Sequence, residues 1–294
     1  MNYFTKMRGR TARVTFGSSE MFTRNMRKTY ALSLIDKMPP LPKGRPFPRI
    51  APDQVVKELR ERVNDPSTQD QMNTSLCGPA AFFYCVLNYK PELYVQYVID
   101  LLTTGKARID SLTVEPSLAC RAYDPGSKIA AVDWIALASL RDSENTVINY
   151  ESADQDVPAI TRPATLASWL RVVGYQSVRD NTNYYFCKGR KEIDAVIRDI
   201  SLSLDVCLLV NKNILDVATS KMKSTFCNHW IVASDTPKLN GDQIEISVYT
   251  WGQILKIPQH GSLSVREFCL NFYGYVSGML VEPLPQSLPG YRGP

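Results

Sequence analysis

The sequence predicts an α+β fold, in which helices fill the first two thirds of the chain and an antiparallel sheet fills the last third. Apolar residues recur at helical spacing in several segments between residues 53 and 204. After residue 205 the apolar segments are short and rich in β-branched and aromatic residues, as strands are. Because the two kinds of segment follow one another instead of alternating, a parallel sheet built from βαβ units is disfavoured.

The composition is that of a chain with a packed core. Hydrophobic residues make up 44% of the 294 positions and charged residues 21%, which disfavours global disorder. No apolar run is long enough for a membrane span, and the N-terminus lacks the apolar core of a cleavable secretory signal. The seven cysteines form no CxxC pair and only two histidines occur, so we expect reduced thiols, no metal site and no cofactor.

The first 52 residues differ from the rest of the chain. Residues 1–50 contain 11 Lys and Arg residues but only two acidic residues, Glu20 and Asp36. The segment after residue 37 is punctuated by prolines, which exclude a helix interior there: Pro39, Pro40, Pro42, Pro46, Pro48 and Pro52. We therefore read residues 1–52 as a basic, Pro-rich arm and linker, and residues 53–294 as one domain. The charge of the arm suits an anionic surface or a delivery partner, but a solvated leader that packs on the domain is the simpler interpretation.

Six segments predict helices. The first begins at Asp53, a good N-cap, and ends at Asp65-Pro66. The second begins near Cys77 and is apolar on nearly every side, which predicts a buried helix with Pro79 in its first turn. The others are expected at residues 91–104 with Gly105 as the stop, 131–141, 165–173 with Gly174 as the stop, and 191–204.

Four segments predict strands, at residues 206–210, 229–234, 244–251 and 274–282. Asn240-Gly241 is a hairpin-turn signal between the second and the third. Asp133-Trp134 and Arg141-Asp142 fall on a predicted helix, where a solvated face or a structural ion pair is the expected role.

Cys77 is the candidate nucleophile. A thiolate is stabilised at a helix N-terminus by unpaired N–H groups and by the helix dipole. Cys77 stands where the buried helix begins, and Gly78 after it allows a substrate to approach the backbone closely. The other six cysteines lie inside apolar or strand segments and are interpreted as core residues.

The base for such a thiol must be His229 or His260. His229 opens a predicted strand, whereas His260 lies in a predicted surface turn, PQHGS. A strand holds a base more rigidly than a turn, so we favour His229. Gln71, six residues before Cys77, is the candidate oxyanion donor together with the Cys77 backbone N–H, and Gln69 is a weaker candidate.

These residues carry a resemblance to a known family. The segment QMNTSLCGPAAFFYCVL, residues 71–87, resembles the nucleophile segment of papain-like cysteine peptidases, especially the branch that processes bacteriocins. The segment NHWIVASD, residues 228–235, resembles the histidine strand of that family. The resemblance implies a papain-like fold, with Cys77 as nucleophile, His229 as general base and Gln71 in the oxyanion hole.

The third catalytic residue departs from the family pattern. Papain-like enzymes orient the histidine with an Asn or Asp that is often followed closely by a Trp-Gly pair. Here Trp251-Gly252 is present, but Tyr249 and Thr250 stand where the amide or carboxylate is expected. Thr250 can orient an imidazole through its hydroxyl, more weakly than a charged partner does, and Asp235 and Glu245 are the alternatives.

The sequence thus predicts a cysteine hydrolase that cleaves a peptide or amide bond in a protein or peptide substrate. A deamidase or acyl transferase acting on a target-cell protein, and a cell-wall amidase, would use the same residues. The missing Asn or Asp keeps a third class open, a catalytically silent papain-like module that only binds a partner. No nucleic-acid partner and no membrane span are expected.

The setting follows by analogy only. The lack of a signal-peptide core, the basic leader and the single catalytic domain resemble bacterial effectors or toxins that a specialised secretion system delivers. Such a protein is cytoplasmic in the producing cell, acts in a target cell, and implies a neutralising immunity protein as a second partner.

Overall fold

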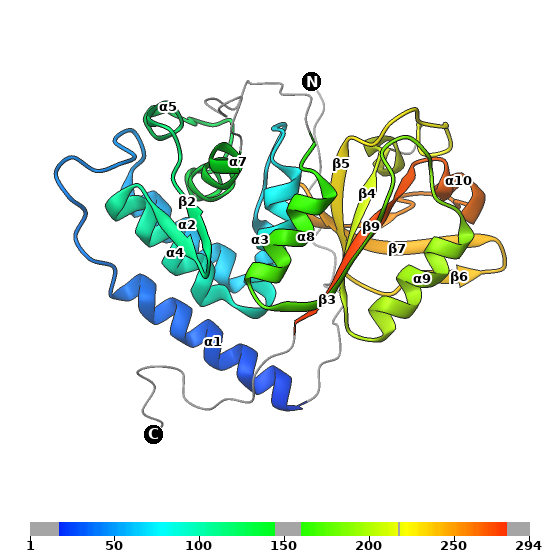
Figure 1. Cartoon of the computed structure of the whole chain (residues 1–294), viewed down its shortest axis with the longest axis horizontal. Coiled ribbons are helices and arrows are strands. Elements are labelled where there is room, and N and C mark those ends of the chain that lie inside the picture. The colour runs from blue at the N-terminus through cyan, green and yellow to red at the C-terminus, as the bar shows by residue number, and fades with distance from the viewer. Residues whose placement is uncertain (1–17, 145–159, 217, 281–294) are drawn as a thin grey trace.

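A computed structural model describes residues 18–144, 160–216 and 218–280. It consists of a helical part, formed by the first part of the chain, beside a curled antiparallel sheet formed mainly by the last third (Figure 1). The predicted α+β class and the order of its two parts are therefore confirmed.

The helical part surrounds one central helix, α3, at Cys77–Tyr89. Almost every residue of α3 is buried, as its apolar sequence predicts. The other helices of this part are α1 (Ser18–Asp36), α2 (Pro52–Asn64), α4 (Pro91–Thr104), α5 (Leu118–Ala122), α6 (Ala131–Asp133), α7 (Ser139–Glu144) and α8 (Pro163–Val172). A π-helical turn, Trp134–Ala138, joins α6 to α7, a 3₁₀ turn follows α2 at Pro66–Thr68, and a small hairpin pairs β1 (Ala107–Ile109) with β2 (Leu112–Val114).

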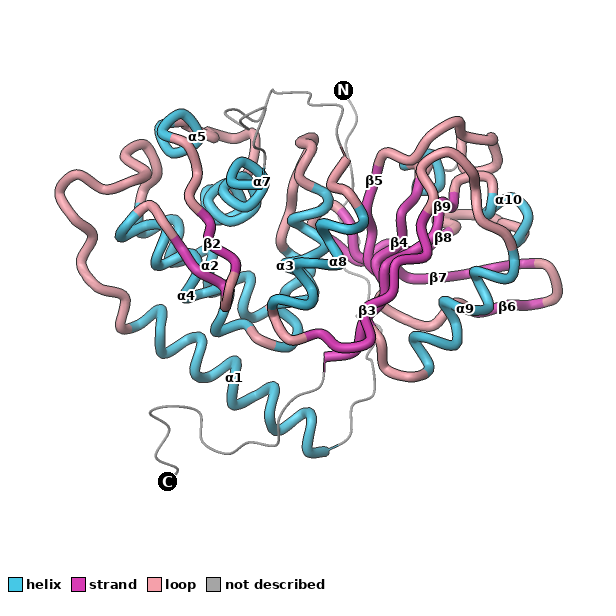
Figure 2. The backbone as a smooth tube through the Cα atoms, in the orientation of Figure 1, coloured by secondary structure: helices cyan, strands magenta, loops and turns pink. Residues whose placement is uncertain are grey.

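The sheet has the strand order β3-β9-β4-β5-β7-β6, β8 also pairs with β7, and every pairing is antiparallel (Figure 2). The strands are β3 (Tyr175–Thr182), β4 (Asp205–Val210), β5 (His229–Ala233), β6 (Lys238–Asn240), β7 (Gln243–Thr250), β8 (Gln253–Ile257) and β9 (Phe272–Leu280). Two helices lie beside the sheet away from α3: α9 (Arg190–Ser201) and α10 (Val265–Cys269).

Two apolar clusters hold the molecule together. The larger one joins the helical part to one face of the sheet, and includes Phe82 and Phe83 of α3, Trp230 of β5 and Tyr249 of β7. The smaller cluster lies under α9 and α10 on the other face. Tyr84 of α3 stacks on Tyr249 with 3.9 Å between ring centroids, so the central helix is fixed directly against the strands β5 and β7.

The segment expected to be an arm and linker, residues 1–52, forms a helix in part and packs on the rest of the described chain. Ser18–Asp36 forms the helix α1, which packs along α4 and α2. Ala31 and Ile35 of α1, and Phe47 and Ile50 in the Pro-rich segment, are buried in the larger cluster. Because the segment is basic, its apolar positions at helical spacing were not recognised as the buried face of a helix. The prolines exclude a helix only in the chain that follows α1. Residues 1–17 of the expected arm lie outside the described residues.

Most predicted elements occur within a few residues of their expected bounds. Gly105 ends α4 in the left-handed conformation, at φ 77°, as predicted. The N-cap of α2 is Ala51, with Pro52 in the first turn, so the capping role expected for Asp53 is wrong. Asn240-Gly241 forms a turn as predicted, but the turn joins β6 to β7. The short strand β6 lies between β5 and this turn and was not expected.

Strands β3 and β8 were not predicted. Strand β3 reads YQSVRDNT and is largely exposed, so it carries little apolar alternation. Its place in the sheet comes from pairing with β9. Strand β8 follows β7 through the tight turn at Trp251 and Gly252, both with positive φ. Within the described residues, the helices are either too short or too polar to cross a membrane.

Candidate active site

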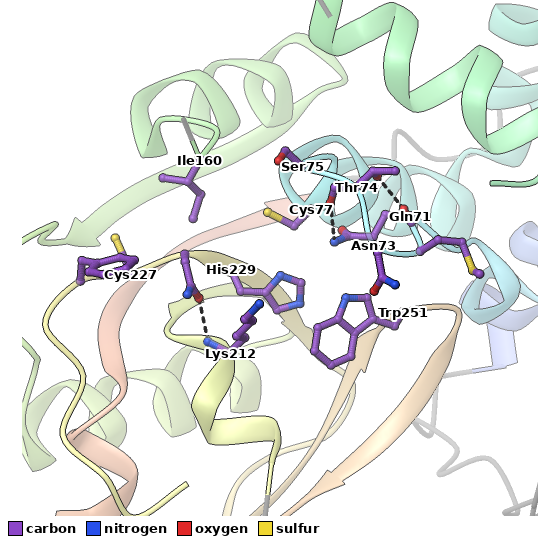
Figure 3. Close-up of a pocket in the computed structure, with 13 residues that line it drawn as sticks. Gln71, Asn73, Thr74, Ser75, Cys77, Ile160, Lys212, Cys227, His229 and Trp251 are labelled. Carbon is purple, nitrogen blue, oxygen red and sulfur yellow. Dashed lines mark hydrogen bonds between the residues drawn. The ribbon is translucent and has the colours of Figure 1, made fainter. Parts of the chain in front are cut away.

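A cavity of about 490 Å³ lies where the N-terminus of α3 meets the start of β5 and the turn between β7 and β8 (Figure 3). It contains three of the four residues predicted to act together, Gln71, Cys77 and His229. The remaining described lining residues are Met72, Asn73, Thr74, Ser75, Ile160, Lys212, Phe226, Cys227, Asn228 and Trp251. Two segments more than 150 positions apart in the sequence thus meet at one site.

Cys77 is the first residue of α3, and 5% of its surface is exposed. Burial raises the pKa of its thiol above the ordinary value. The backbone N–H groups of Trp230, Gly78 and Cys77 itself, with the charge of Arg141, act in the opposite direction and lower that pKa. These groups favour the thiolate, but burial outweighs them, so the resting thiol remains protonated.

The role expected for Gly78 was wrong. A Cβ at this position would overlap the side chain of Thr161, so the space beside Gly78 is filled by the protein and not left for a substrate. Thr161 also accepts a hydrogen bond at its carbonyl from Trp230 Nε1, at 2.9 Å. Gly78 thus lets α3 pack tightly against the segment that precedes α8.

The replacement Gly78→Ala is expected to lower the free energy of unfolding by about 1–3 kcal/mol, the usual cost of overpacking. Chemical denaturation measures the loss. Adding Thr161→Gly, which removes the overlapping atoms, should restore much of the lost stability. If Gly78→Ala is neutral by itself, the close packing of Thr161 on α3 is not present.

His229 is the first residue of β5 and is almost fully buried, with 4% of its surface exposed. Its Nε2 lies 2.8 Å from Thr250 Oγ1, and its ring stacks on Trp251 at 4.9 Å between centroids. These two contacts fix the ring plane. With the proton on Nε2 donated to Thr250, Nδ1 keeps a lone pair that can accept a proton.

The imidazole is neutral in the resting site. Burial lowers the pKa of His229 to about 3, and the nearby positive charge of Lys212 acts in the same direction. In the part of the chain that the structure describes, no hydrogen bond joins the Cys77 sulfur to the ring. The resting pair is therefore a neutral thiol and a neutral imidazole, not an ion pair.

Gln71 lies on the loop that leads into α3, and its side chain extends toward Cys77 (Figure 3). Its Nε2 donates to Thr74 O at 3.3 Å, and since an amide nitrogen has two hydrogens, a second donor remains for an oxyanion. Thr74 Oγ1 in turn donates to Gln71 O at 2.6 Å, which closes the loop on itself.

Buried polar contacts fix the loop that carries Gln71 to the rest of the protein. Asp133 accepts a hydrogen bond from Asp70 N at 3.0 Å and pairs with Arg62 Nη2 at 2.6 Å. Tyr249 Oη donates to Gln69 O at 2.7 Å. Asp133 is therefore one half of a structural ion pair, as anticipated, and Gln69, the weaker oxyanion candidate, is fully buried and does not line the cavity.

Of the three candidates for the residue that orients His229, Thr250 is the one that contacts it. Asp235 Oδ1 accepts from Ser247 N at 2.8 Å, and Glu245 pairs with Lys256 at 2.6 Å. The alternative base His260 is exposed and is not among the lining residues.

Thr250→Val keeps the shape of the side chain but removes the hydroxyl, so we expect kcat/KM for the predicted amide-bond cleavage to fall about tenfold. Thr250→Ser keeps the hydroxyl and should fall much less. Since the change concerns the orientation of the base, the loss should lie mainly in kcat. Equal activity of the Val and Ser variants would mean that the hydroxyl has no orienting role.

Several lining residues were missed by sequence reasoning. Lys212 and Phe226 carry no motif, and Cys227, taken as a core residue, faces the cavity although only 7% of its surface is exposed. Asn228 Oδ1 accepts from Lys212 N at 2.8 Å, which fixes the chain after β4 beside His229. The one available signal was the position of Asn228 next to the histidine. Among the described residues, no group of His, Cys, Asp and Glu side chains is arranged to hold a metal ion.

Comparison with protein-family models, with curated proteins and with solved structures yields no match to this chain. The geometry of the site and the resemblance of the two short motifs are therefore the basis for assigning a function.

Proposed function

We propose that this protein is a papain-like cysteine hydrolase that cleaves a peptide or amide bond, with Cys77 as nucleophile and His229 as general base. The single observation that carries the proposal is the meeting of these two side chains in one cavity. Trp230, which follows the base on β5, also lowers the pKa of the Cys77 thiol through its backbone N–H.

The first half of the reaction forms a thioester. His229 Nδ1 takes the thiol proton as the Cys77 sulfur attacks the carbonyl carbon of the amide. The oxyanion that forms is held by Gln71 Nε2–H and the Cys77 N–H. When the tetrahedral intermediate collapses, the C–N bond breaks and His229 returns the proton to the leaving amine.

The second half consumes water. His229 removes a proton from a water molecule, which attacks the thioester carbon, and the C–S bond breaks to give a carboxylic acid and the free thiol. An acceptor amine in place of water would give acyl transfer, and a side-chain carboxamide as substrate would give deamidation, with ammonia as the leaving amine.

A second candidate is a silent module that binds a partner through the same cavity. The neutral resting pair favours it, because a His229 pKa of about 3 makes the ring a weak base in the free protein. A neutral hydroxyl at Thr250 also stabilises an imidazolium less than a carboxylate would.

A peptide-library assay tests the proposal. Wild type and Cys77→Ala are incubated with a proteome-derived peptide mixture, and mass spectrometry records new termini, side-chain deamidation and free ammonia. New termini that require Cys77 support a peptidase, and mass shifts of +1 Da with ammonia release support a deamidase. If wild type and Cys77→Ala give the same products on peptides and on purified peptidoglycan, the hydrolase proposal is wrong and the binding module stands.

We also propose, by analogy, that the hydrolase acts as a bacterial effector or toxin with a cognate immunity protein. Expression in the bacterial cytoplasm and, separately, in the periplasm tests this. Toxicity in one compartment that Cys77→Ala abolishes supports the proposal, and growth unaffected in both compartments contradicts it.

A further inference from the structure

Among the described residues that line the candidate site, Lys212 is the one that carries a positive charge. Lys212 lines the cavity, is exposed, and extends its side chain toward the His229 ring (Figure 3). Its place is fixed by the sheet: Val210 at the end of β4 pairs with His229, and two residues later the Lys212 N–H is bonded to Asn228. The position of the charge beside the base is thus built into the strand register.

The charge of Lys212 is not neutralised by the described residues. None of the lining residues is acidic, and across residues 18–144, 160–216 and 218–280 Lys212 enters no ion pair. The remaining described lining groups are the neutral His229 imidazole, amides, hydroxyls, thiols and apolar or aromatic side chains, and Phe226 and Met72 are 58% and 42% exposed. An uncompensated cation in a cavity with few other charges attracts an anion.

We propose that Lys212 forms an anion subsite beside His229, which selects substrates whose leaving amine carries a carboxylate. This inference rests on the proposed function. The leaving amine must lie next to His229, because His229 protonates it. A carboxylate on that amine therefore lies on the same side as Lys212, either as the α-carboxylate of a terminal residue or as an acidic side chain.

The arrangement also couples binding to the chemistry. Lys212 disfavours a positive charge on His229 in the free protein. A bound carboxylate offsets that repulsion, so the imidazolium that forms during acylation becomes less costly when such a substrate is present. A substrate with a carboxylate on its leaving amine should therefore acylate Cys77 faster than a neutral one.

Two alkylating reagents of similar size test the subsite without a known substrate: iodoacetate, which carries a carboxylate, and neutral iodoacetamide. Peptide mapping by mass spectrometry gives the rate at Cys77 separately from that at Cys227. In Lys212→Met, the ratio of the iodoacetate rate to the iodoacetamide rate at Cys77 should fall about threefold or more. Lys212→Arg should keep the ratio, and the difference should shrink at high salt.

Lys238→Met is the matched control, because Lys238 is exposed on β6 and does not line the cavity. It changes the net charge equally and should leave the ratio unchanged. An unchanged ratio in Lys212→Met, or an equal fall in Lys238→Met, overturns the proposal. The proposed function is tested separately by the rate at which iodoacetamide alkylates Cys77 in His229→Ala. A failure of the subsite and a failure of the Cys77–His229 pair are therefore distinguishable.

Small amides identify the source of the carboxylate. N-acetylalanine, N-acetyl-aspartic acid α-amide and neutral N-acetylalaninamide, in which the amine half of the acetyl amide carries an α-carboxylate, an acidic side chain or neither, are compared as protectants of Cys77 against iodoacetamide. Protection by N-acetylalanine alone assigns the α-carboxylate, and protection by N-acetyl-aspartic acid α-amide alone assigns an acidic side chain. If neither protects more strongly than N-acetylalaninamide, or if Lys212→Met leaves the protection intact, the subsite is not present.

Discussion

His229→Ala is expected to lower the rate of amide hydrolysis by about a thousandfold, the typical contribution of a positioned general base. Without the ring, the described lining residues include neither an imidazole nor a carboxylate that could accept the proton of the Cys77 thiol, and burial keeps the pKa of that thiol above the ordinary value. The measurement is kcat/KM for a peptide identified by its cleavage products.

His260→Ala supplies the matched control, since it removes the other histidine of the chain from an exposed turn. It should leave kcat/KM within about twofold of wild type, as surface substitutions usually do. A similar loss in both variants, or a full rate in His229→Ala, contradicts the role given to His229.

Arg62→Met is expected to cost about 3–5 kcal/mol of unfolding free energy, because it leaves the buried Asp133 carboxylate without its partner. Asp133 also accepts from Asp70 N, so the loop that carries Gln71 should loosen at the same time. Urea denaturation measures the stability. Arg60→Met on the same helix is the control: Arg60 pairs with the exposed Asp36, and its loss should cost less than about 1 kcal/mol.

The decrease in unfolding free energy caused by Arg62→Met should become larger as pH rises. Burial raises the pKa of Asp133 to about 6, above its unfolded value of 3.8, while Arg62 works against the rise. Without Arg62 the folded pKa rises further, so the native state holds a proton that the unfolded state releases. Stability is then lost as pH rises above 3.8, and the deficit should be larger at pH 8 than at pH 5. A deficit independent of pH would mean that the charge of Asp133 is not the cause.

Features that depend on residues close together in the sequence could be predicted. Cys77 opens α3 because an apolar run follows a polar loop with Pro79 in the first turn, and His229 opens β5 because the strand residues follow it directly. Gln71 could be singled out from its spacing alone. Helix α1 was missed because its basic residues and the prolines after it outweighed an apolar stripe that only packing against α4 explains.

The remaining features depend on contacts between distant segments. Lys212 reaches the cavity through the register of β4 on β5, and Arg62 supports the Gln71 loop through Asp133, 71 positions away. The choice of Thr250 over Asp235 and Glu245 depended on how β7 faces β5. No local pattern encodes such pairings, since a shift of one residue along a strand would turn each side chain to the other face.

The most direct test of the central claim is to trap the acyl-enzyme. Wild type is mixed with an N-acetyl-peptide p-nitrophenyl ester and quenched in acid within milliseconds to seconds, and the acyl group is located by peptide mapping. The account predicts one acyl group per chain on Cys77, formed much more slowly in His229→Ala and not at all in Cys77→Ala. Acylation of wild type at another cysteine in preference to Cys77, at a rate unaffected by His229→Ala, would contradict it.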